Sequence, residues 1–167
     1  LTFDYTKGTP DYKYVDMNEL WFGVYDFGDY ANQQPVPEVD FEFPHATEKA
    51  NLKIITTGHN WRSGTNNAYN TGNAAEFYEA THNIKLNDNI AYTQHLWQTC
   101  NPNPAGCQPQ NGTWTYDRSG WCPGSLGMVW DFSLDQFISA GDVNLFYEFD
   151  PTYLDLCHPN HPDCVDG

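Results

Sequence analysis

The sequence has few basic residues. Its 167 residues include 7 Lys and Arg against 22 Asp and Glu, which gives a formal net charge of −15 at pH 7. Nucleic acid is therefore not expected as a partner, because phosphate backbones attract Lys and Arg rather than carboxylates. Long apolar runs are also missing, and no segment approaches the roughly 18 residues that indicate a membrane-spanning helix. The sequence thus predicts neither a nucleic-acid-binding protein nor a membrane span.

Charged residues make up only 17% of the chain, whereas aromatic residues reach 16% and apolar residues 40%. This composition is too apolar for a disordered acidic chain and predicts a folded core. At this length about 68–70% of the surface of the unfolded chain is buried on folding, which suits a single domain over residues 1–167. Aromatic richness with many Asn, Thr and Gly is typical of β-sandwich domains.

Period-2 alternation and β-branched residues predict a series of short strands. At 39–43 the alternation places Val39, Phe41 and Phe43 on the core face. Segment 74–86 is ambiguous because Ala and Glu favour helix, but the turn at 87–89 favours a strand and a second hairpin arm. Short strands without convincing helices predict an antiparallel sandwich. The predicted strands and strand-like segments are 12–17, 19–25, 39–43, 51–57, 74–86, 90–97, 128–134 and 144–150, with Asp142 at the turn before the last.

Two long segments, 58–73 and 100–127, have no hydrophobic period, and loops of that length usually carry function. Cysteines occur only from residue 100 onward, among Pro, Asn and Gly. Loop cysteines of this kind predict disulfides in an oxidising compartment, although their spacing leaves the pairing open. They are Cys100, Cys107, Cys122, Cys157 and Cys164.

Metal binding is the less favoured interpretation of two clusters. Cys157 and Cys164 enclose two histidines, and such a group could bind zinc. The spacing is too tight and too rich in Pro for a known finger pattern, so we expect a short disulfide between these cysteines. Calcium binding by acidic residues lacks the EF-hand spacing, and no metal is expected. The acidic residues in question are Asp26, Asp29 and Asp40.

Four sequence blocks, in order and at closely similar spacing, carry a resemblance to a known family. They are Gly-Thr-Pro-Asp-Tyr-Lys-Tyr at 8–14, Thr-Glu-Lys-Ala at 47–50, Ala-Glu at 75–76 with Thr-His at 81–82, and Asp-Arg-Ser-Gly-Trp-Cys-Pro-Gly at 117–124. From about residue 8 to the Tyr147 region the chain resembles the C-terminal jelly-roll domain of the peptide-N-glycosidase F family. The resemblance implies an all-β antiparallel jelly-roll sandwich of the kind shared with peptidylglycine monooxygenases.

In that family two jelly rolls pack side by side, and the active site lies in the cleft between them. The resemblance therefore implies that this chain is half of a two-domain unit. The N-terminal jelly-roll domain is expected to be absent from it, as is the last strand of the C-terminal domain. It implies a bacterial hydrolase, an amidase that cleaves the amide between an Asn side chain and the first GlcNAc of an N-glycan without a cofactor. The main catalytic Asp lies in the absent domain, so we expect the isolated chain to be inactive.

Together, the cysteines and the resemblance imply an exported protein that is secreted, periplasmic or on the cell surface. Its expected partners are an N-glycan or N-glycoprotein and the missing N-terminal domain. The expected contribution of this chain is a set of residues that contact the glycan.

Glu76 is the candidate catalytic residue. Ala74, Ala75 and Phe77 give it an apolar setting, which is expected to raise the pKa of the carboxyl group and to suit proton transfer or a hydrogen bond to a sugar. Without the resemblance, a solvated surface carboxylate would be the ordinary interpretation. The resemblance matches 75–77 to an Ala-Glu-Trp motif whose Glu contacts the chitobiose core. Phe77 replaces the Trp, and Ala74 and Tyr78 replace a bridging Cys pair.

The candidate substrate-binding residues are Arg118, Trp121, Phe77, Trp61 and His59. A planar guanidinium suits sugar hydroxyl and carbonyl groups, and exposed aromatic rings stack on pyranose rings. The resemblance matches Arg118 and Trp121 to residues of the cleft, whereas Trp61 and His59 stand where the family has the same residue types in exchanged order.

Structural interpretations compete with these roles. Arg118 could pair with Asp117 beside it, and Trp61 or Trp114 could cover the sandwich edge. The resemblance also matches Cys100 and Cys122 to a disulfide, which would contribute about 3 kcal/mol of stability in the chain-entropy account.

Two other functions compete with the amidase. A noncatalytic glycan-binding or structural sandwich of a larger secreted or surface protein is favoured by the replaced Cys pair and Trp. A copper monooxygenase on the related double jelly roll is disfavoured, because no His-x-His occurs and Met17 and Met128 lack a histidine-rich setting.

Overall fold

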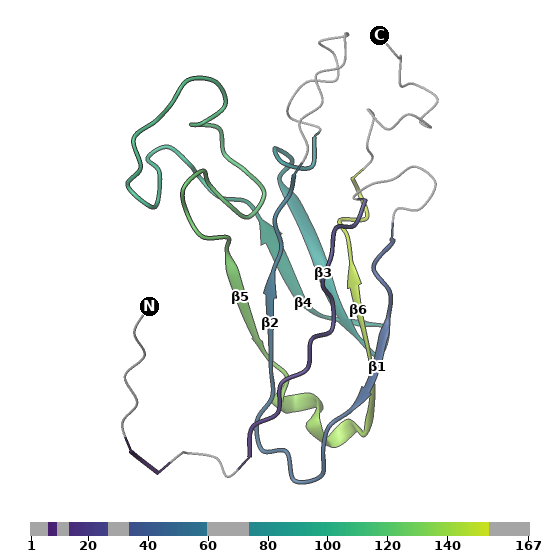
Figure 1. Ribbon diagram of the computed structural model, residues 1–167. Coiled ribbons are helices and arrows are strands. Elements are labelled where there is room, and N and C mark those ends of the chain that lie inside the picture. The colour runs from purple at the N-terminus through teal and green to yellow at the C-terminus, as the bar shows by residue number, and fades with distance from the viewer. Residues whose placement is uncertain (1–6, 10–13, 27–33, 60–73, 154–167) are drawn as a thin grey trace.

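The computed structural model describes residues 7–9, 14–26, 34–59 and 74–153 (Figure 1). In these residues the strands form two antiparallel sheets, one with the order β1-β6-β3-β4 and one with the order β2-β5. The all-β antiparallel sandwich predicted from the sequence is confirmed. The strands are β1 (Val39–Glu42), β2 (Asn51–Ile55), β3 (Ala80–Leu86), β4 (Asn89–Leu96), β5 (Val129–Ser133) and β6 (Asp142–Glu148).

Alternation along the strands builds the core. In β6 every second residue is buried, so Val143, Leu145 and Tyr147 face the second sheet while the residues between them are more exposed. The register of β1 against β6 pairs Val39 with Leu145, which continues the apolar face across the sheet. The core cluster consists of Val36, Leu52, Ile84, Leu86, Leu134, Val143, Leu145, Tyr147 and Phe149.

The predicted hairpin between β3 and β4 is present. Asn87 and Asp88 occupy its two central positions with φ of 50° and 63°, and Leu86 faces Asn89 across the turn. A two-residue loop with positive φ at both positions matches the right-handed twist of the flanking strands, and Asn and Asp tolerate that conformation.

Three details of the predicted strand pattern are wrong. The strand predicted at 74–86 begins only at Ala80, and 74–77 form a turn in which the N–H of Phe77 donates to the carbonyl of Ala74 at 2.8 Å. Residues 14–25 form no strand, although Trp21 packs against the core and donates its indole N–H to the carbonyl of Pro37. A 3₁₀ helix, η2 (Asp135–Ala140), connects β5 to β6, so Asp142 begins a strand.

Two of these differences have an identifiable cause. Ala and Glu are depleted in strands and give 74–79 little preference for one. The carbonyl of Ala50 accepts from the N–H of Leu134, and the carboxylate of Asp135 accepts from the N–H of Ala50, so both groups anchor the start of the 3₁₀ helix to the entry of β2. Within the described residues, no helix has the length and apolar character required of a membrane span.

Candidate functional site

Three loop segments meet at one end of the sandwich: 56–59 after β2, 74–79 before β3, and the segment of 98–127 that leads from β4 to β5 (Figure 1). Backbone hydrogen bonds tie them together. The N–H of Gly58 donates to the carbonyl of Ser119 at 2.9 Å, and the N–H of Ser119 donates to the carbonyl of Glu76 at 2.9 Å. The hydroxyl of Ser119 donates to the carbonyl of Tyr78. Ser119 is therefore the point at which the three segments are joined.

The close approach of these segments requires glycine at position 58. A Cβ at Gly58 would lie 2.0 Å from the carbonyl oxygen of Ala75 and 2.7 Å from Cβ of Ser119. Both contacts are far inside van der Waals separation, so any side chain at position 58 would push the segments apart. Gly120 has a similar role, with φ of +81° and the carbonyl of Thr56 only 2.3 Å from the position of a Cβ.

Glu76 and Arg118 form an ion pair at this junction. Nε of Arg118 donates to Oε1 of Glu76 at 2.8 Å, and the side chains are only 4% exposed for Arg118 and 15% exposed for Glu76. The apolar setting expected for Glu76 is therefore incomplete, because a guanidinium lies against the carboxylate. Within the described residues, Oε2 of Glu76 has no hydrogen-bond partner and remains able to accept a bond from a ligand.

Every N–H group of Arg118 is used within the chain. Besides the bond from Nε, Nη1 donates to the carbonyls of Tyr116 at 2.8 Å and Trp114 at 3.4 Å. Nη2 donates to the carbonyl of Thr113 at 2.7 Å and to its hydroxyl at 3.1 Å. A guanidinium has five N–H donors, and all of them are satisfied. Oxygen atoms of segment 113–116 thus surround the guanidinium of Arg118, which has no donor left for a ligand.

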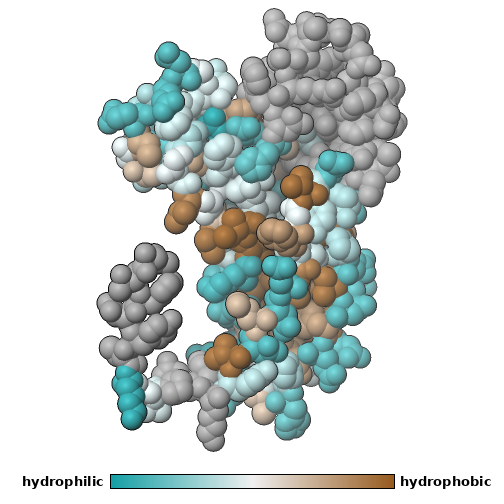
Figure 2. Space-filling view, in the orientation of Figure 1, coloured by the Kyte–Doolittle hydropathy of each residue, from teal (hydrophilic) through white to brown (hydrophobic). Residues whose placement is uncertain are grey.

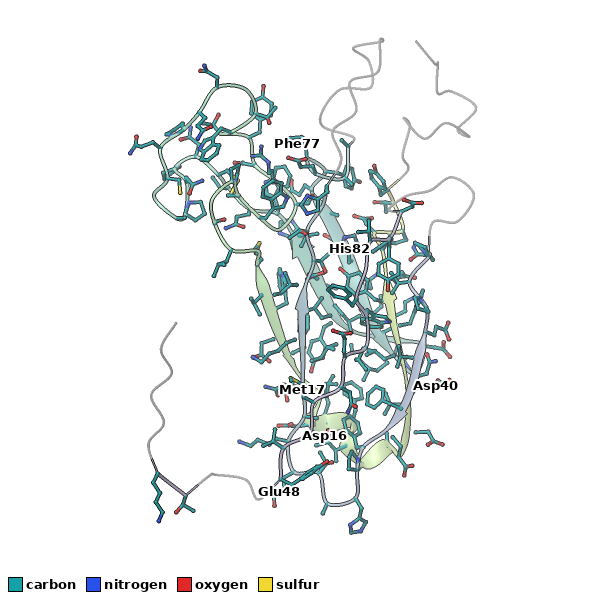
Figure 3. The ribbon with its side chains drawn as sticks, in the orientation of Figure 1. Asp16, Met17, Asp40, Glu48, Phe77 and His82 are labelled. Carbon is teal, nitrogen blue, oxygen red and sulfur yellow. A yellow bond between two sulfur atoms is a disulfide. The ribbon has the colours of Figure 1, made fainter. Side chains whose placement is uncertain are left out.

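Aromatic rings enclose the same guanidinium. Its central carbon lies 5.1 Å from the ring centroids of both Phe77 and Trp121, within the range of a cation–π contact. The indole N–H of Trp121 donates to the carbonyl of Gly58 at 2.8 Å, and the imidazole of His59 lies 5.2 Å from Trp121. Phe77, buried to 6% exposure, is labelled at this end of the molecule in Figure 3.

A disulfide joins Cys100 to Cys122, the pairing implied by the resemblance. The bond closes the segment that carries Arg118. The carboxylate of Asp117 accepts from the backbone N–H of Cys100 at 2.9 Å, so Asp117 pairs with the backbone and Arg118 pairs with Glu76 instead. Two backbone bonds between Gln98 and Arg118, at 2.8 and 3.0 Å, complete the attachment of this segment. Cys107 is a free thiol, half-buried in the same loop.

A buried polar network lies beneath the loops. The N–H of Asp150 donates to Nδ1 of His82 at 2.8 Å, and burial lowers the pKa of His82 to about 4 against the attraction of the Asp150 carboxylate. Burial also raises the pKa of Tyr147, whose hydroxyl bonds to Gln94 and, at 3.0 Å, to Thr56. The network therefore connects β4 and β6 to the end of β2 through Tyr147, and it holds His82 in the neutral form near pH 7. His82 is labelled in Figure 3.

The structure brings five predicted site residues together: Glu76, Phe77, Arg118, Trp121 and His59. Trp61, Cys157, Cys164 and Asp29 lie outside the described residues, which hold no group of three or more potential metal ligands. The sequence reasoning missed Thr113, Ser119 and Tyr116. A signal for them was available, because a loop Arg needs several acceptors and the residues just before it are the nearest source.

Comparisons with known proteins agree with this architecture. The family model for the C-terminal part of peptide-N-glycosidase F matches residues 26–148. Peptide-N(4)-(N-acetyl-beta-D-glucosaminyl)asparagine amidase F of Elizabethkingia miricola is 34% identical over an alignment of 131 residues, and the match covers 74% of this chain and 36% of the relative. The chain thus spans about a third of the length of that relative.

Solved structures show the same relation. A recombinant peptide:N-glycanase F superposes with a TM-score of 0.56 and 27% identity, covering 71% of this chain and 37% of the other. A glycosylasparaginase structure from Flavobacterium meningosepticum gives a TM-score of 0.59 at 24% identity, over 80% of this chain and 39% of the other, and shows the shared fold. The chain belongs to the peptide-N-glycosidase F family, whose C-terminal domain it matches.

Proposed function

We propose that this chain is the glycan-contacting domain of a peptide-N-glycosidase F-like amidase. The observation that carries the proposal is the buried Arg118, which holds the Glu76 carboxylate beside a partly exposed aromatic rim and leaves Oε2 of Glu76 without a partner among the described residues. A carboxylate oxygen accepts hydrogen bonds from sugar hydroxyl and N-acetyl N–H groups. Glu76 then contacts the chitobiose core, with His59 and Trp121 at its side.

In the proposed reaction, the oxygen of a water molecule attacks the carbonyl carbon of the Asn side-chain amide. The C–N bond breaks, the glycan leaves as a glycosylamine, and the Asn becomes Asp. The acid or base for this step comes from an N-terminal jelly-roll domain that completes the cleft, while Glu76 fixes the glycan so that the scissile amide is presented to that domain. Catalysis thus depends on the pair of domains, and residues 1–167 alone bind without hydrolysing.

Arg118 is a positioning residue in this scheme. Because all of its N–H donors are occupied inside the chain, its role is to orient Glu76 and the segment 113–116 rather than to touch substrate. Export of the protein fits the same proposal, since a disulfide stabilises the loops that carry the site and such bonds persist in oxidising compartments.

The test is N-glycan release from a denatured N-glycoprotein by the full-length protein. Glu76→Gln is expected to lower the rate at least tenfold, because the amide no longer pairs with the guanidinium as a carboxylate does. Glu79→Gln is the matched control, since Glu79 is 57% exposed and its ion pair within the described ranges is with the exposed residue His95. An active protein whose Glu76→Gln variant keeps the wild-type rate would contradict the proposal.

A noncatalytic glycan-binding module is the second candidate. The observation in its favour is the ion pair itself, because a carboxylate held by a buried guanidinium is better suited to accept hydrogen bonds than to donate a proton. The two candidates separate in one comparison: a full-length protein that binds chitobiose through Glu76 but releases no glycan is a binding module.

A further inference from the structure

We propose that Tyr116 supplies the ring surface on which a pyranose of the bound glycan stacks, next to the carboxylate of Glu76. The inference deepens the proposed function and rests on it. It assigns the aromatic contact to a residue that neither the sequence motifs nor the resemblance pointed to.

Accessibility separates Tyr116 from the other rings of the site. Tyr116 is 49% exposed, whereas Phe77 is 6% exposed and is packed against the guanidinium of Arg118. Trp121 is half-buried, with Arg118 at 5.1 Å and His59 at 5.2 Å from its ring. Stacking needs an open ring face of about the area of a sugar, and Tyr116 offers the most open face among these three rings.

The same contacts hold Tyr116 in a defined place. Its carbonyl accepts from Nη1 of Arg118 at 2.8 Å, and its N–H donates to the carbonyl of Thr113 at 3.0 Å. Its ring meets the ring of Phe77 at a centroid distance of 6.0 Å and an interplanar angle of 74°, an edge-to-face contact. A ring fixed in this way loses little conformational entropy on binding, which favours affinity.

Chemistry at this end of the molecule indicates the class of ligand. A tyrosine face is uncharged and suits the C–H face of a pyranose. Oε2 of Glu76, which has no partner in the described part of the chain, accepts from the hydroxyl or N-acetyl groups of the sugar. The net charge of −15 disfavours anionic sugars. In Figure 2 the surface of the loops that carry Tyr116 is mostly hydrophilic to neutral, as expected for a carbohydrate site. The ligand class is a neutral, gluco-configured pyranose with equatorial substituents.

Titration of the 167-residue chain with N,N′-diacetylchitobiose, followed by calorimetry and NMR, tests the inference. Tyr116→Ala is expected to raise Kd about tenfold, equivalent to about 1.4 kcal/mol. Tyr116→Phe should stay within about twofold, because it keeps the ring. Tyr14→Ala is the matched control. Tyr14 is 72% exposed, and Asp16 and Met17 of the same segment lie at the other end of the molecule from Phe77 (Figure 3), so its loss should leave Kd unchanged.

Two failures are distinguishable. If the wild-type chain binds, Glu76→Gln weakens binding, and Tyr116→Ala keeps the wild-type Kd, then the Tyr116 inference is overturned and the proposed function stands. A Tyr116→Phe variant that loses as much affinity as Tyr116→Ala also overturns it, because the contact would then be made by the hydroxyl. If the wild-type chain shows no binding, both proposals are contradicted. Amide spectra of each variant verify that the fold is retained, as expected because Arg118 holds the backbone of Tyr116 and not its side chain.

Discussion

The sheets hold their arrangement through apolar side chains, whereas the loop end that carries the site is held by one guanidinium, a disulfide and a set of backbone bonds. Leu145 in β6 is fully buried among other apolar residues and stabilises the fold through the hydrophobic effect, because its side chain is removed from water. Arg118 is as deeply buried, but it contributes through directed hydrogen bonds to 113–116 and to Glu76. Damage to the core should therefore lower stability with little change at the site, whereas damage at Arg118 should alter the site itself.

The largest expected effect on stability comes from the core. Leu145→Ala should lower the free energy of unfolding by about 2–5 kcal/mol, because it removes a fully buried side chain and leaves a cavity. Denaturant unfolding measures the change. At temperatures where the variant stays folded, its Kd for diacetylchitobiose should match the wild-type value. A large loss of affinity would contradict the view that the core sets stability and the loop end sets binding.

Acid is expected to lower the stability of the fold through His82, in the buried polar network that lies between the sheets and the loops of the site. The pKa of His82 is about 4 in the folded chain and 6.5 when exposed, so between these values the unfolded state binds a proton that the folded state does not. Stability should therefore fall as pH falls from 6.5 to 4, by about 3 kcal/mol in total. A His82→Gln variant should flatten the slope of unfolding free energy against pH in this window. Equal slopes in variant and wild type would contradict the assignment to His82.

Below that window two carboxylates add to the loss. Burial alone would raise the pKa of Asp150, but hydrogen bonds from Thr152 and Thr81 and the nearby His82 lower it. Burial likewise opposes the shift at Glu148, where bonds from Lys85 and Asn83 and the charge of Lys85 lower the pKa. Both groups stabilise the fold above the carboxyl pKa of the unfolded chain. That contribution is lost as pH falls through their lowered values.

The smallest effect is expected on the outer face of β2 and β5. Lys53 and Asp131 form an ion pair there, with side chains 65% and 44% exposed. Exposed pairs typically contribute 0.2–1 kcal/mol, so Lys53→Ala should change the free energy of unfolding by less than about 1 kcal/mol. A loss of several kcal/mol would contradict the account, because this exposed pair would then contribute as much to stability as a buried core residue.

How far the sequence predicts the molecule differs between the same two regions. Alternation at 39–43 predicted β1 because period 2 is a local property that burial on one face enforces. The strand predicted at 144–150 corresponds to β6, which begins two residues earlier at Asp142. Segment 74–79 could not be placed from its own residues. Its position depends on two residues that are distant in the chain. Ser119 donates to the carbonyls of Glu76 and Tyr78, and Gly58, which has no side chain, leaves room for the carbonyl of Ala75.

The candidate site shows the same limit. Glu76 and Arg118 were identified through sequence blocks, but nothing in 113–118 alone indicates that Arg118 pairs with a carboxylate 42 residues earlier rather than with its neighbour Asp117. The depth of Phe77 and the exposure of Tyr116 are likewise products of tertiary packing, so residue type alone could not say which ring faces solvent.

One measurement tests most directly whether Arg118 organises the proposed glycan-contacting end: the affinity of an Arg118→Lys variant for diacetylchitobiose. Lysine keeps the charge, but its three donors on a single nitrogen cannot reach Glu76 and the acceptors of 113–116 together. We expect Kd to rise at least about tenfold while the amide signals of the sheets stay in place. An Arg118→Lys variant that binds with the wild-type Kd would contradict the account.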